Sequence, residues 1–379
     1  MIGLKWLTGL ALGMLFWTYV GYPLLMLLLA RWRPRPVRVA DFTPNVTLII
    51  PAYNEEKYIA ARIENALALD YPPEQLHIIV VADGSTDATP ILVQAYAERG
   101  VQVLYQPARR GKIAAMNRAV AYATGEILAF SDANTFLEPG SLRTLLRNFA
   151  DPQVGCVSGA KHVRPDVQVQ ARGESLYWRY EALLKTAESR TGSSSGAVGE
   201  FFAVRRSLYR TLEEDIILDD FVLSMRLALE GWRVLYEAQA VAWETASPSL
   251  SAEWERRARN IAGGFQALGR LRALFSWRHL PFALQFTSHK ILRWTAWLWM
   301  AVAWLGSALL NALPLYRFLF LAQTLFYLLA FLGYLLERSG RPWRPLQVIF
   351  YFTFGNLTGL AGFWRHLTRR QSSLWKKVR

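Results

Sequence analysis

The stretch that decides the fold is HIIVVADGS, residues 77–85. Its apolar part runs from Ile78 to Ala82 and ends at Asp83, and a Gly-Ser turn follows. A short β-branched run bounded by turn residues is typical of a strand buried on both faces. A carboxylate directly after such a strand stands at the sheet edge where ligands bind in α/β proteins.

Similar apolar runs occur on both sides of this segment. They lie at residues 46–50, 101–104 and 126–131. The segments between them, 55–69, 86–99 and 113–123, have helical spacing of apolar residues. Strands that alternate with helices predict an α/β fold with a mostly parallel, doubly wound sheet. Asp132 follows the last run, as Asp83 follows the segment described above.

Composition separates this region from the two ends of the chain. The chain has 379 residues and a formal net charge of +14, and its basic residues cluster at 31–35, 256–278 and 369–379 beside apolar runs. Such clusters face anionic lipid headgroups more often than nucleic acid, and the middle region shows no aromatic-basic repeat. Cys156 is the only cysteine, so no intrachain disulfide can form, which suits the cytoplasm.

Four apolar stretches are long enough to be membrane helices. They are Trp6–Ala30, Trp294–Tyr316, Phe318–Leu336 and Leu346–Trp364. Positive charge after the first places the middle region in the cytoplasm, yet three later crossings would put the basic tail outside, against the positive-inside rule. The last stretch contains three glycines and is our first candidate for a re-entrant or interfacial segment.

These patterns divide the chain into five parts at a plasma (inner) membrane. We predict an N-terminal transmembrane anchor at 1–31, a cytoplasmic catalytic domain at 44–245, amphipathic interfacial helices at 250–290, C-terminal transmembrane segments at 291–365 and a basic tail at 366–379.

Acidic motifs in the middle region each allow two interpretations. Asp83 can bind a ribose or base, or it can simply begin a turn together with Asp87. Asp132 and Asn134 can share one divalent ion, or they can form an Asx turn. The pair 219–220 can supply a general base, or it can cap the helix that follows.

Basic motifs are equally ambiguous when taken alone. Residues 109–112, Arg-Arg-Gly-Lys, precede a helix and can bind a diphosphate, or they can form a solvated loop. Arg256, Arg257 and Arg259 allow the same two interpretations, and contact with lipid is a third.

In combination, these motifs resemble those of the family 2 glycosyltransferases with the GT-A fold, a Rossmann-like nucleotide-diphospho-sugar transferase fold. The membrane-embedded branch with cellulose, hyaluronan and poly-N-acetylglucosamine synthases is the most similar. The resemblance covers Val46 to about Gly264. It implies an inverting hexosyltransferase that uses Mg²⁺ or Mn²⁺ and a nucleotide-sugar donor, with a UDP-sugar expected. The acceptor would be a polysaccharide or a lipid-linked sugar.

The same resemblance assigns roles to particular residues. It implies Asp220 as the catalytic base and Asp132 with Asn134 as the metal ligands, Asn134 replacing the family's second acid. The substrate-binding residues that it implies are Pro51, Tyr53, Glu55, Asp83, Lys112, Glu200, Phe201, Arg256 and Arg259.

Three departures from the family pattern leave alternatives open. Ala82 and Asn134 replace acids, and Asn260 replaces the tryptophan of the Gln-x-x-Arg-Trp motif of polymer synthases. A synthase and a single-addition transferase therefore both fit, and a wide export channel would require a homo-oligomer. The alternative function is a catalytically silent, membrane-bound sugar-nucleotide-binding assembly partner.

Overall fold

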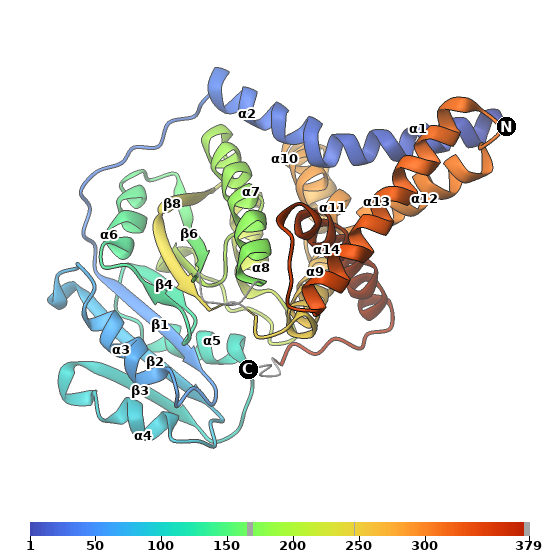
Figure 1. Cartoon of the computed structure of the whole chain (residues 1–379). Helices are drawn as coiled ribbons and strands as arrows, with labels where there is room; N and C mark the ends of the chain where they lie inside the picture. Colours follow the sequence, from blue (N-terminus) through green and yellow to red (C-terminus); the bar gives the residue numbers. More distant parts are fainter. Residues whose placement is uncertain (165–169, 246, 375–379) are drawn as a thin grey trace.

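The computed structural model describes residues 1–164, 170–245 and 247–374, and it contains one mixed sheet (Figure 1). The eight strands stand in the order β3-β2-β1-β4-β7-β6-β8-β5. Their bounds are β1 Val46–Ala52, β2 Leu76–Asp83, β3 Val101–Gln106, β4 Ile127–Ser131, β5 Phe136–Leu137, β6 Val154–Val163, β7 Phe201–Arg205 and β8 Arg233–Glu244. β1 to β4 are mutually parallel where they pair, and β7 is antiparallel to β4.

Helices cover both faces of this sheet. Those of the sheet domain are α3 Ile59–Leu67, α4 Thr89–Gln94, α5 Lys112–Tyr122, α6 Ser141–Leu146, α7 Gln170–Thr191 and α8 Asp219–Leu229. After β8 follow α9 Leu250–Arg270, α10 Leu280–Phe286, a π-helical turn Thr287–Ile291 and α11 Leu292–Trp294. Short 3₁₀ turns lie at Pro73–Gln75, Ala97–Arg99, Arg147–Ala150, Arg206–Leu208, Arg272–Phe275 and Trp277–His279.

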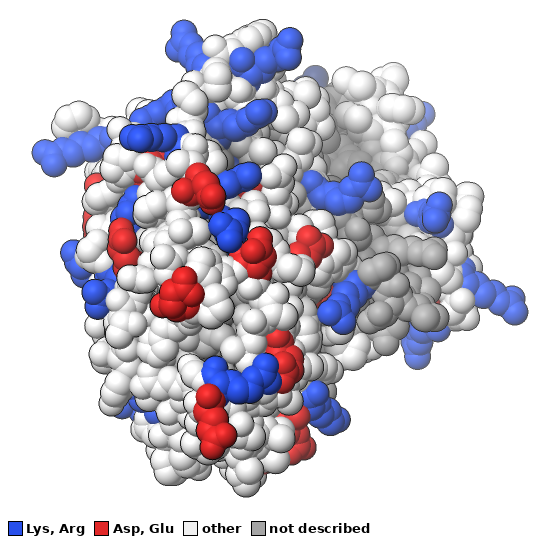
Figure 2. Space-filling view, turned by 90° about the vertical axis from the view of Figure 1, so that its left-hand side faces the viewer, with Lys and Arg blue, Asp and Glu red and all other residues white. Residues whose placement is uncertain are grey.

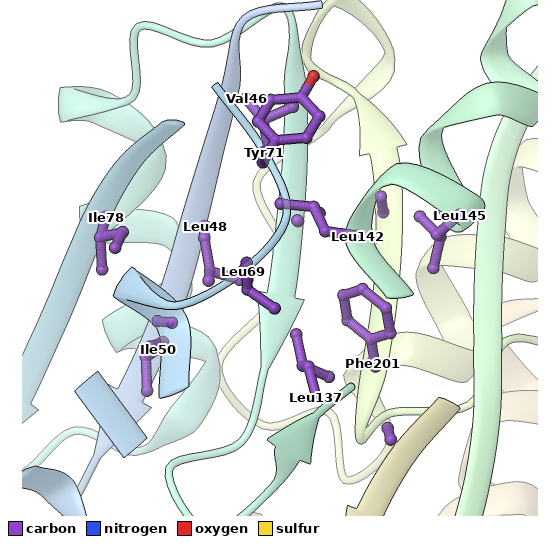
Figure 3. Packing of buried hydrophobic residues seen from close by; sticks show 14 of the residues in the cluster. Val46, Leu48, Ile50, Leu69, Tyr71, Ile78, Leu137, Leu142, Leu145 and Phe201 are labelled. Carbon is purple, nitrogen blue, oxygen red and sulfur yellow. The ribbon is translucent and has the colours of Figure 1, made fainter. Parts of the chain in front are cut away.

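Alternate residues of the central strands build two hydrophobic clusters. Leu48 and Ile50 of β1 face the first, where Leu142 and Leu145 of α6 pack over the sheet (Figure 3). Ile49 faces the second cluster, to which α5, α8, α9 and α10 contribute. Since successive strand residues point to opposite faces, the continuous apolar sequence of β1 follows from burial on both sides.

The sheet confirms the α/β prediction and corrects its details. The four predicted strands are present as β1 to β4. We expected the first strand to stop at Pro51, but it continues through Pro51 to Ala52 and pairs there with β2. The pairing with β4 ends at Ile49, so Pro51 lies where β1 has only one neighbour, a position that tolerates proline. β5 to β8 were not predicted, and antiparallel β7 makes the sheet mixed.

A second group of helices lies to one side of the sheet domain (Figure 1). The N-terminal helix runs through α1 Ile2–Phe16, a π-helical turn Trp17–Gly21 and α2 Tyr22–Trp32. α12 Ala296–Leu309, α13 Pro314–Arg338 and α14 Arg344–Leu367 complete the group. Within the described residues, three helices are long and apolar enough to cross a membrane: 2–32, 314–338 and 344–367.

The predicted span at 294–316 is wrong in its bounds. α12 has 14 residues, so it is roughly 21 Å long at about 1.5 Å per residue and is shorter than a hydrocarbon core of about 30 Å. The chain turns at 310–313, and Pro314 opens the next helix, where its missing N–H carries no penalty.

The glycine-rich helix α14 packs against α9 and α11 as well as against the other apolar helices. A Cβ at Gly362 would lie 2.7 Å from Ile261 of α9, and a Cβ at Gly359 would lie 2.6 Å from the carbonyl oxygen of Trp294. These glycines therefore permit close helix contacts. Whether α14 crosses the membrane or lies at its surface stays a prediction.

Charge is distributed unevenly over the outer face of the sheet domain. Most of that face shows acidic and basic side chains side by side, whereas the upper part of Figure 2 is mainly basic. Exposed arginines lie in the last turn of α2 and in the segment after it: Arg31, Arg33, Arg35 and Arg38. A basic segment directly after an apolar helix is the arrangement that anionic headgroups favour.

We predict that Phe130→Ala will destabilise the sheet domain by about 3–5 kcal/mol, the usual cost of removing a buried phenylalanine. Phe130 is buried and stacks on Phe202 and Tyr209, with ring centroids 5.0 and 5.9 Å away. Thermal unfolding of the full chain in detergent measures the loss. Tyr105→Ala, at a side chain 51% exposed, is the control, and equal midpoints for the two variants would contradict this packing.

Candidate active site

The site is built where β4, α5 and α8 meet. β4 ends at Ser131, so Asp132 emerges at the carboxyl edge of the sheet, and α5 and α8 begin at Lys112 and Asp219. Gly111, with φ +102°, allows the sharp entry into α5. As a result the Lys112 Nζ lies 2.9 Å from Asp132 Oδ1 and 3.4 Å from Asp219 Oδ2.

Lys112 and the surrounding acids control one another's ionisation. Burial alone would lower the pKa of Lys112, but the carboxylates of Asp132 and Asp219 outweigh it and raise that pKa. Burial raises the pKa of Asp132, although Lys112 opposes the shift. The ammonium group is therefore firmly charged and is the internal counter-ion of the cluster.

Asp220 has the most unusual environment of these acids. Burial, reinforced by the negative charge of Asp219, raises the pKa of Asp220 to about 7. Space for its carboxylate depends on Gly199, since a Cβ there would lie 3.0 Å from Asp220 Cγ. A carboxylate that titrates near neutral pH can both accept and release a proton under cellular conditions.

The predicted metal position offers hard oxygen donors. The Asp132 side chain is only 17% exposed. The amide nitrogen of Asn134 donates a hydrogen bond to Glu244 Oε1 at 3.0 Å, so the amide oxygen is the atom of Asn134 that could bind a metal ion. No group of three His, Cys, Asp or Glu side chains among the described residues could hold a metal by itself. A Mg²⁺ or Mn²⁺ ion fits such a site when the diphosphate supplies further oxygens.

Both oxygens of the Asp83 carboxylate make contacts within the protein. Its Oδ2 accepts hydrogen bonds from the backbone N–H groups of Arg110 and Gly111, at 2.9 and 2.6 Å, and its Oδ1 pairs with Arg118 at 2.9 Å. The buried carboxylate thus fixes the loop that leads into Lys112. The same loop carries Arg109, whose guanidinium lies 3.7 Å from the ring centroid of Tyr53.

Glu200 belongs to a buried network that the sequence did not indicate. Lys161 of β6, with a side chain 2% exposed, pairs with Glu200 at 2.5 Å and with Glu244. Since Glu244 also accepts from Asn134, this network connects the metal position to Glu200. In the sequence Lys161 stands between Ala160 and His162, which gives no sign of its burial, and its two glutamates come from distant segments.

A cavity of about 590 Å³ lies at this site. Half of the predicted site residues line it, namely Lys112, Asp132, Glu200, Asp220, Arg256 and Arg259, whereas Asn134 is not among its lining residues. The segment after α14 also lines it, and Arg259 donates to the carbonyl oxygen of Ser373 at 3.2 Å. Cations and carboxylates therefore share a single cavity.

Other predicted residues lie outside that cavity. Pro51, Tyr53 and Glu55 belong to the end of β1 and the turn after it, beside the loop that Asp83 holds. Phe201 must be reassigned, because it is fully buried in the first hydrophobic cluster and points into the core (Figure 3). Strand alternation explains this, since its neighbour Phe202 faces the opposite side of the sheet.

Arg62 is a further residue that the sequence did not reveal. It is fully buried on α3, its Nε and Nη2 have no hydrogen-bond partner among the described residues, and Asp132 is the charge that acts on it. Burial lowers the pKa of Arg62 to about 10. This guanidinium adds positive charge behind the metal position.

Comparison with known proteins agrees with this geometry. Residues 47–213 match the family model described as glycosyl transferase family 2. The chain is similar to a mannosyltransferase from Pyrobaculum calidifontis, solved in complex with GDP-mannose and Mn²⁺. The two share 26% identity with a TM-score of 0.73, and the match covers 96% of this chain and 99% of that one.

Curated relatives point to the same family. The chain is 28% identical over 242 residues to poly-β-1,6-N-acetyl-D-glucosamine synthase of Staphylococcus aureus, which covers 62% of this chain and 58% of that protein. The synthase of Staphylococcus epidermidis is 23% identical over 229 residues, covering 59% and 55%. The match thus spans less than two thirds of these relatives. From its motifs, its sheet and these matches, the chain contains a family 2 glycosyltransferase domain with the GT-A fold.

Proposed function

We propose that this protein is an inverting glycosyltransferase at a membrane. It moves a sugar from a nucleoside diphosphate to a hydroxyl of a polysaccharide or lipid-linked acceptor. The observation that carries the proposal is the position of Asp220, which shares one cavity with Lys112, Asp132 and Arg259. A base beside a cluster that suits a metal ion and a diphosphate is what a single displacement requires.

Asp220 accepts the proton of the acceptor hydroxyl in this mechanism. Its pKa of about 7, set by burial and by Asp219, matches the demand on a general base at cellular pH. The hydroxyl oxygen attacks the anomeric carbon from the side opposite the leaving diphosphate. The configuration at that carbon is inverted in one step.

The leaving group is stabilised by positive charge. Asp132 and Asn134 would hold the Mg²⁺ or Mn²⁺ ion, which supplies Lewis-acid stabilisation of the diphosphate when bound. Burial lowers the pKa of Lys112, but its carboxylate neighbours raise that pKa by more. The side chain therefore remains an ammonium group that can face a phosphate oxygen. Arg259 lines the same cavity and provides a second cation.

The nucleoside part of the donor belongs beside the loop 109–111. We propose that Asp83 acts there mainly by holding this loop, and that Tyr53 with Arg109 forms one wall. The expected base is uridine. Because the similar mannosyltransferase was solved with GDP-mannose, guanosine must be tested beside it.

The apolar helices would hold the site at a bilayer. Three candidate spans and the exposed arginines at the end of α2 and just beyond it support a multi-pass membrane protein with its sheet domain on the cytoplasmic side. A catalytically silent assembly partner is disfavoured, since Lys112, Asp132 and Asp220 all stand together. Product length from purified enzyme distinguishes the remaining forms, a ladder indicating a synthase and one added sugar a transferase.

Asp220→Asn should lower kcat for transfer and for donor hydrolysis by about 10²–10⁴-fold, the usual contribution of a general base. Binding of UDP or GDP with Mn²⁺, measured by calorimetry, should stay unchanged. Asp215→Asn, at a side chain 69% exposed, is the matched control. Normal turnover by the Asp220→Asn variant would remove Asp220 from the mechanism.

The pH dependence of donor hydrolysis should report the same carboxylate. Because only the ionised form accepts a proton, kcat should fall about tenfold per pH unit below pH 7 and level off above it. The measurement is a rate profile from about pH 5 to 9 at saturating donor and Mn²⁺. A flat profile across this range would be inconsistent with this role.

Gly199→Ala should displace the base without unfolding the domain. The new methyl group would lie 3.0 Å from Asp220 Cγ, so we expect kcat to fall at least about tenfold with little change in donor KM. Gly140→Ala is the control, since nothing lies within 4 Å of its Cβ. If both variants keep full kcat, the Gly199 contact does not position the base.

A further inference from the structure

A second cavity opens on the other side of Asp220. It measures about 290 Å³ and lies between α7, α9, the 287–294 segment and α14, with Tyr19 of the N-terminal helix at its edge. The residues that line both cavities are Gly199, Glu200, Leu218, Asp220, Arg256 and Asn260. Asp220 therefore stands at the junction of two spaces, and only the first contains the donor cluster.

Positive charge exceeds negative charge in the wall of this second cavity. Its described lining residues include five lysines and arginines, Lys185, Arg256, Arg257, Lys290 and Arg293, against three carboxylates, Glu181, Glu200 and Asp220. Glu200 already pairs with Lys161. Buried cations are stable only when an anion compensates them.

One carboxylate serves several of these cations. Glu181 lies 2.6 Å from Lys290 Nζ, 2.7 Å from Arg293 Nη1 and 3.2 Å from His289 Nε2. Arg257 shares the buried Glu253 with Arg256, which donates three hydrogen bonds of 2.8 to 2.9 Å to it. Each carboxylate is thus divided between two or more positive groups, and capacity for a further anion remains on Lys290, Arg293 and Arg257.

Aromatic side chains complete the wall. Tyr177, Trp178, Tyr351 and Phe352 line the cavity, and the Arg257 and Arg293 guanidinium groups lie 4.9 and 5.3 Å from the Tyr177 ring. Aromatic faces beside fixed cations suit a ligand that has both an apolar surface, such as a sugar ring, and an anionic group.

The cavity also reaches the apolar helices. Tyr19 belongs to the candidate span 2–32, and its hydroxyl donates to Asn356 of the span 344–367 at 2.5 Å. Both residues line the cavity. Part of the cavity wall is therefore formed by segments that suit a bilayer.

We propose that this second cavity binds the phosphate group of a lipid-linked acceptor, so that the acceptor is a polyprenyl-type phosphate or diphosphate that bears a sugar. The proposal rests on the function proposed above and names the acceptor class for the same site. The acceptor's sugar hydroxyl forms the new bond to the donor's anomeric carbon as the bond to the diphosphate oxygen breaks. Its proton passes to Asp220, and the nucleoside diphosphate leaves through the first cavity.

Farnesyl diphosphate and farnesol are suitable probes, because they differ only in the anionic group. Full-length protein in phosphatidylcholine nanodiscs is first saturated with UDP or GDP and Mn²⁺, which fills the donor cavity, and binding of each probe is then measured by calorimetry. We expect farnesyl diphosphate to bind at least about tenfold more tightly than farnesol. Equal affinities would overturn the proposal.

Charge removal locates the binding. Arg293→Gln and Arg257→Gln should each reduce the preference for farnesyl diphosphate by about tenfold, while Arg278→Gln, at an exposed arginine outside the cavity, should not. Both probes are measured on one preparation, so partial unfolding lowers the bound amount of both and leaves the ratio of affinities unchanged. An unaltered preference in both cavity variants would refute this location.

Phosphatidylglycerol nanodiscs test whether ordinary anionic headgroups occupy the second cavity. Loss of farnesyl diphosphate binding in these nanodiscs would make it a headgroup site and reject the acceptor proposal, whereas retained binding supports it. Failure of UDP and GDP to bind with Mn²⁺ would instead contradict the proposed transferase function. Donor binding without any diphosphate preference would contradict the acceptor proposal alone.

Discussion

The site depends on the ion pairing of Lys112 with Asp132 and Asp219. Three carboxylates with little exposure to solvent in one cavity would repel one another, and a single ammonium group compensates two of them. Asp220 is left as the acid whose negative charge is least compensated, and burial with Asp219 raises its pKa to about 7. The position of Lys112 thus explains why Asp132 suits a metal ion while Asp220 suits a general base.

That lysine is placed by the sheet. β2 ends at Asp83, whose carboxylate holds the backbone of 110–111, and α5 then begins at Lys112. β4 ends close to Lys112, so that Asp132, the residue after this strand, pairs with the lysine. Because the strand ends lie side by side at one edge of the sheet, residues far apart in sequence can build a single site there.

The amino-acid sequence predicts those parts of the fold and of the site that local patterns encode. Apolar runs predicted β1 to β4, and turn residues after them predicted the positions of Asp83 and Asp132. β5 to β8 were missed because their pairing is non-local. Phe201 was assigned to substrate because the motif gives no information on which face of β7 points to the core. The roles of Arg62 and Lys161 could not be predicted for a similar reason, because the partners of a buried cation are known only from the folded chain.

The second cavity gives the apolar helices a role beyond anchoring, since some of their residues line it. A hydrogen bond from Tyr19 to Asn356 joins two candidate spans at the wall of this cavity. Asp220 also lines the cavity. On the proposed function, these apolar helices would form part of the acceptor site as well as an anchor. This explains why a basic, aromatic cavity lies between the sheet domain and helices that suit a bilayer.

The most direct test of the central claim is a structure of the full chain in a lipid nanodisc with an intact UDP- or GDP-sugar analogue and Mn²⁺. Our account predicts the metal on Asp132, the Lys112 ammonium moved from that carboxylate to the diphosphate, and the Asp220 carboxylate beside the anomeric carbon on the face opposite the leaving group. A diphosphate bound away from Lys112 and Asp132, or an anomeric carbon out of reach of Asp220, would contradict it.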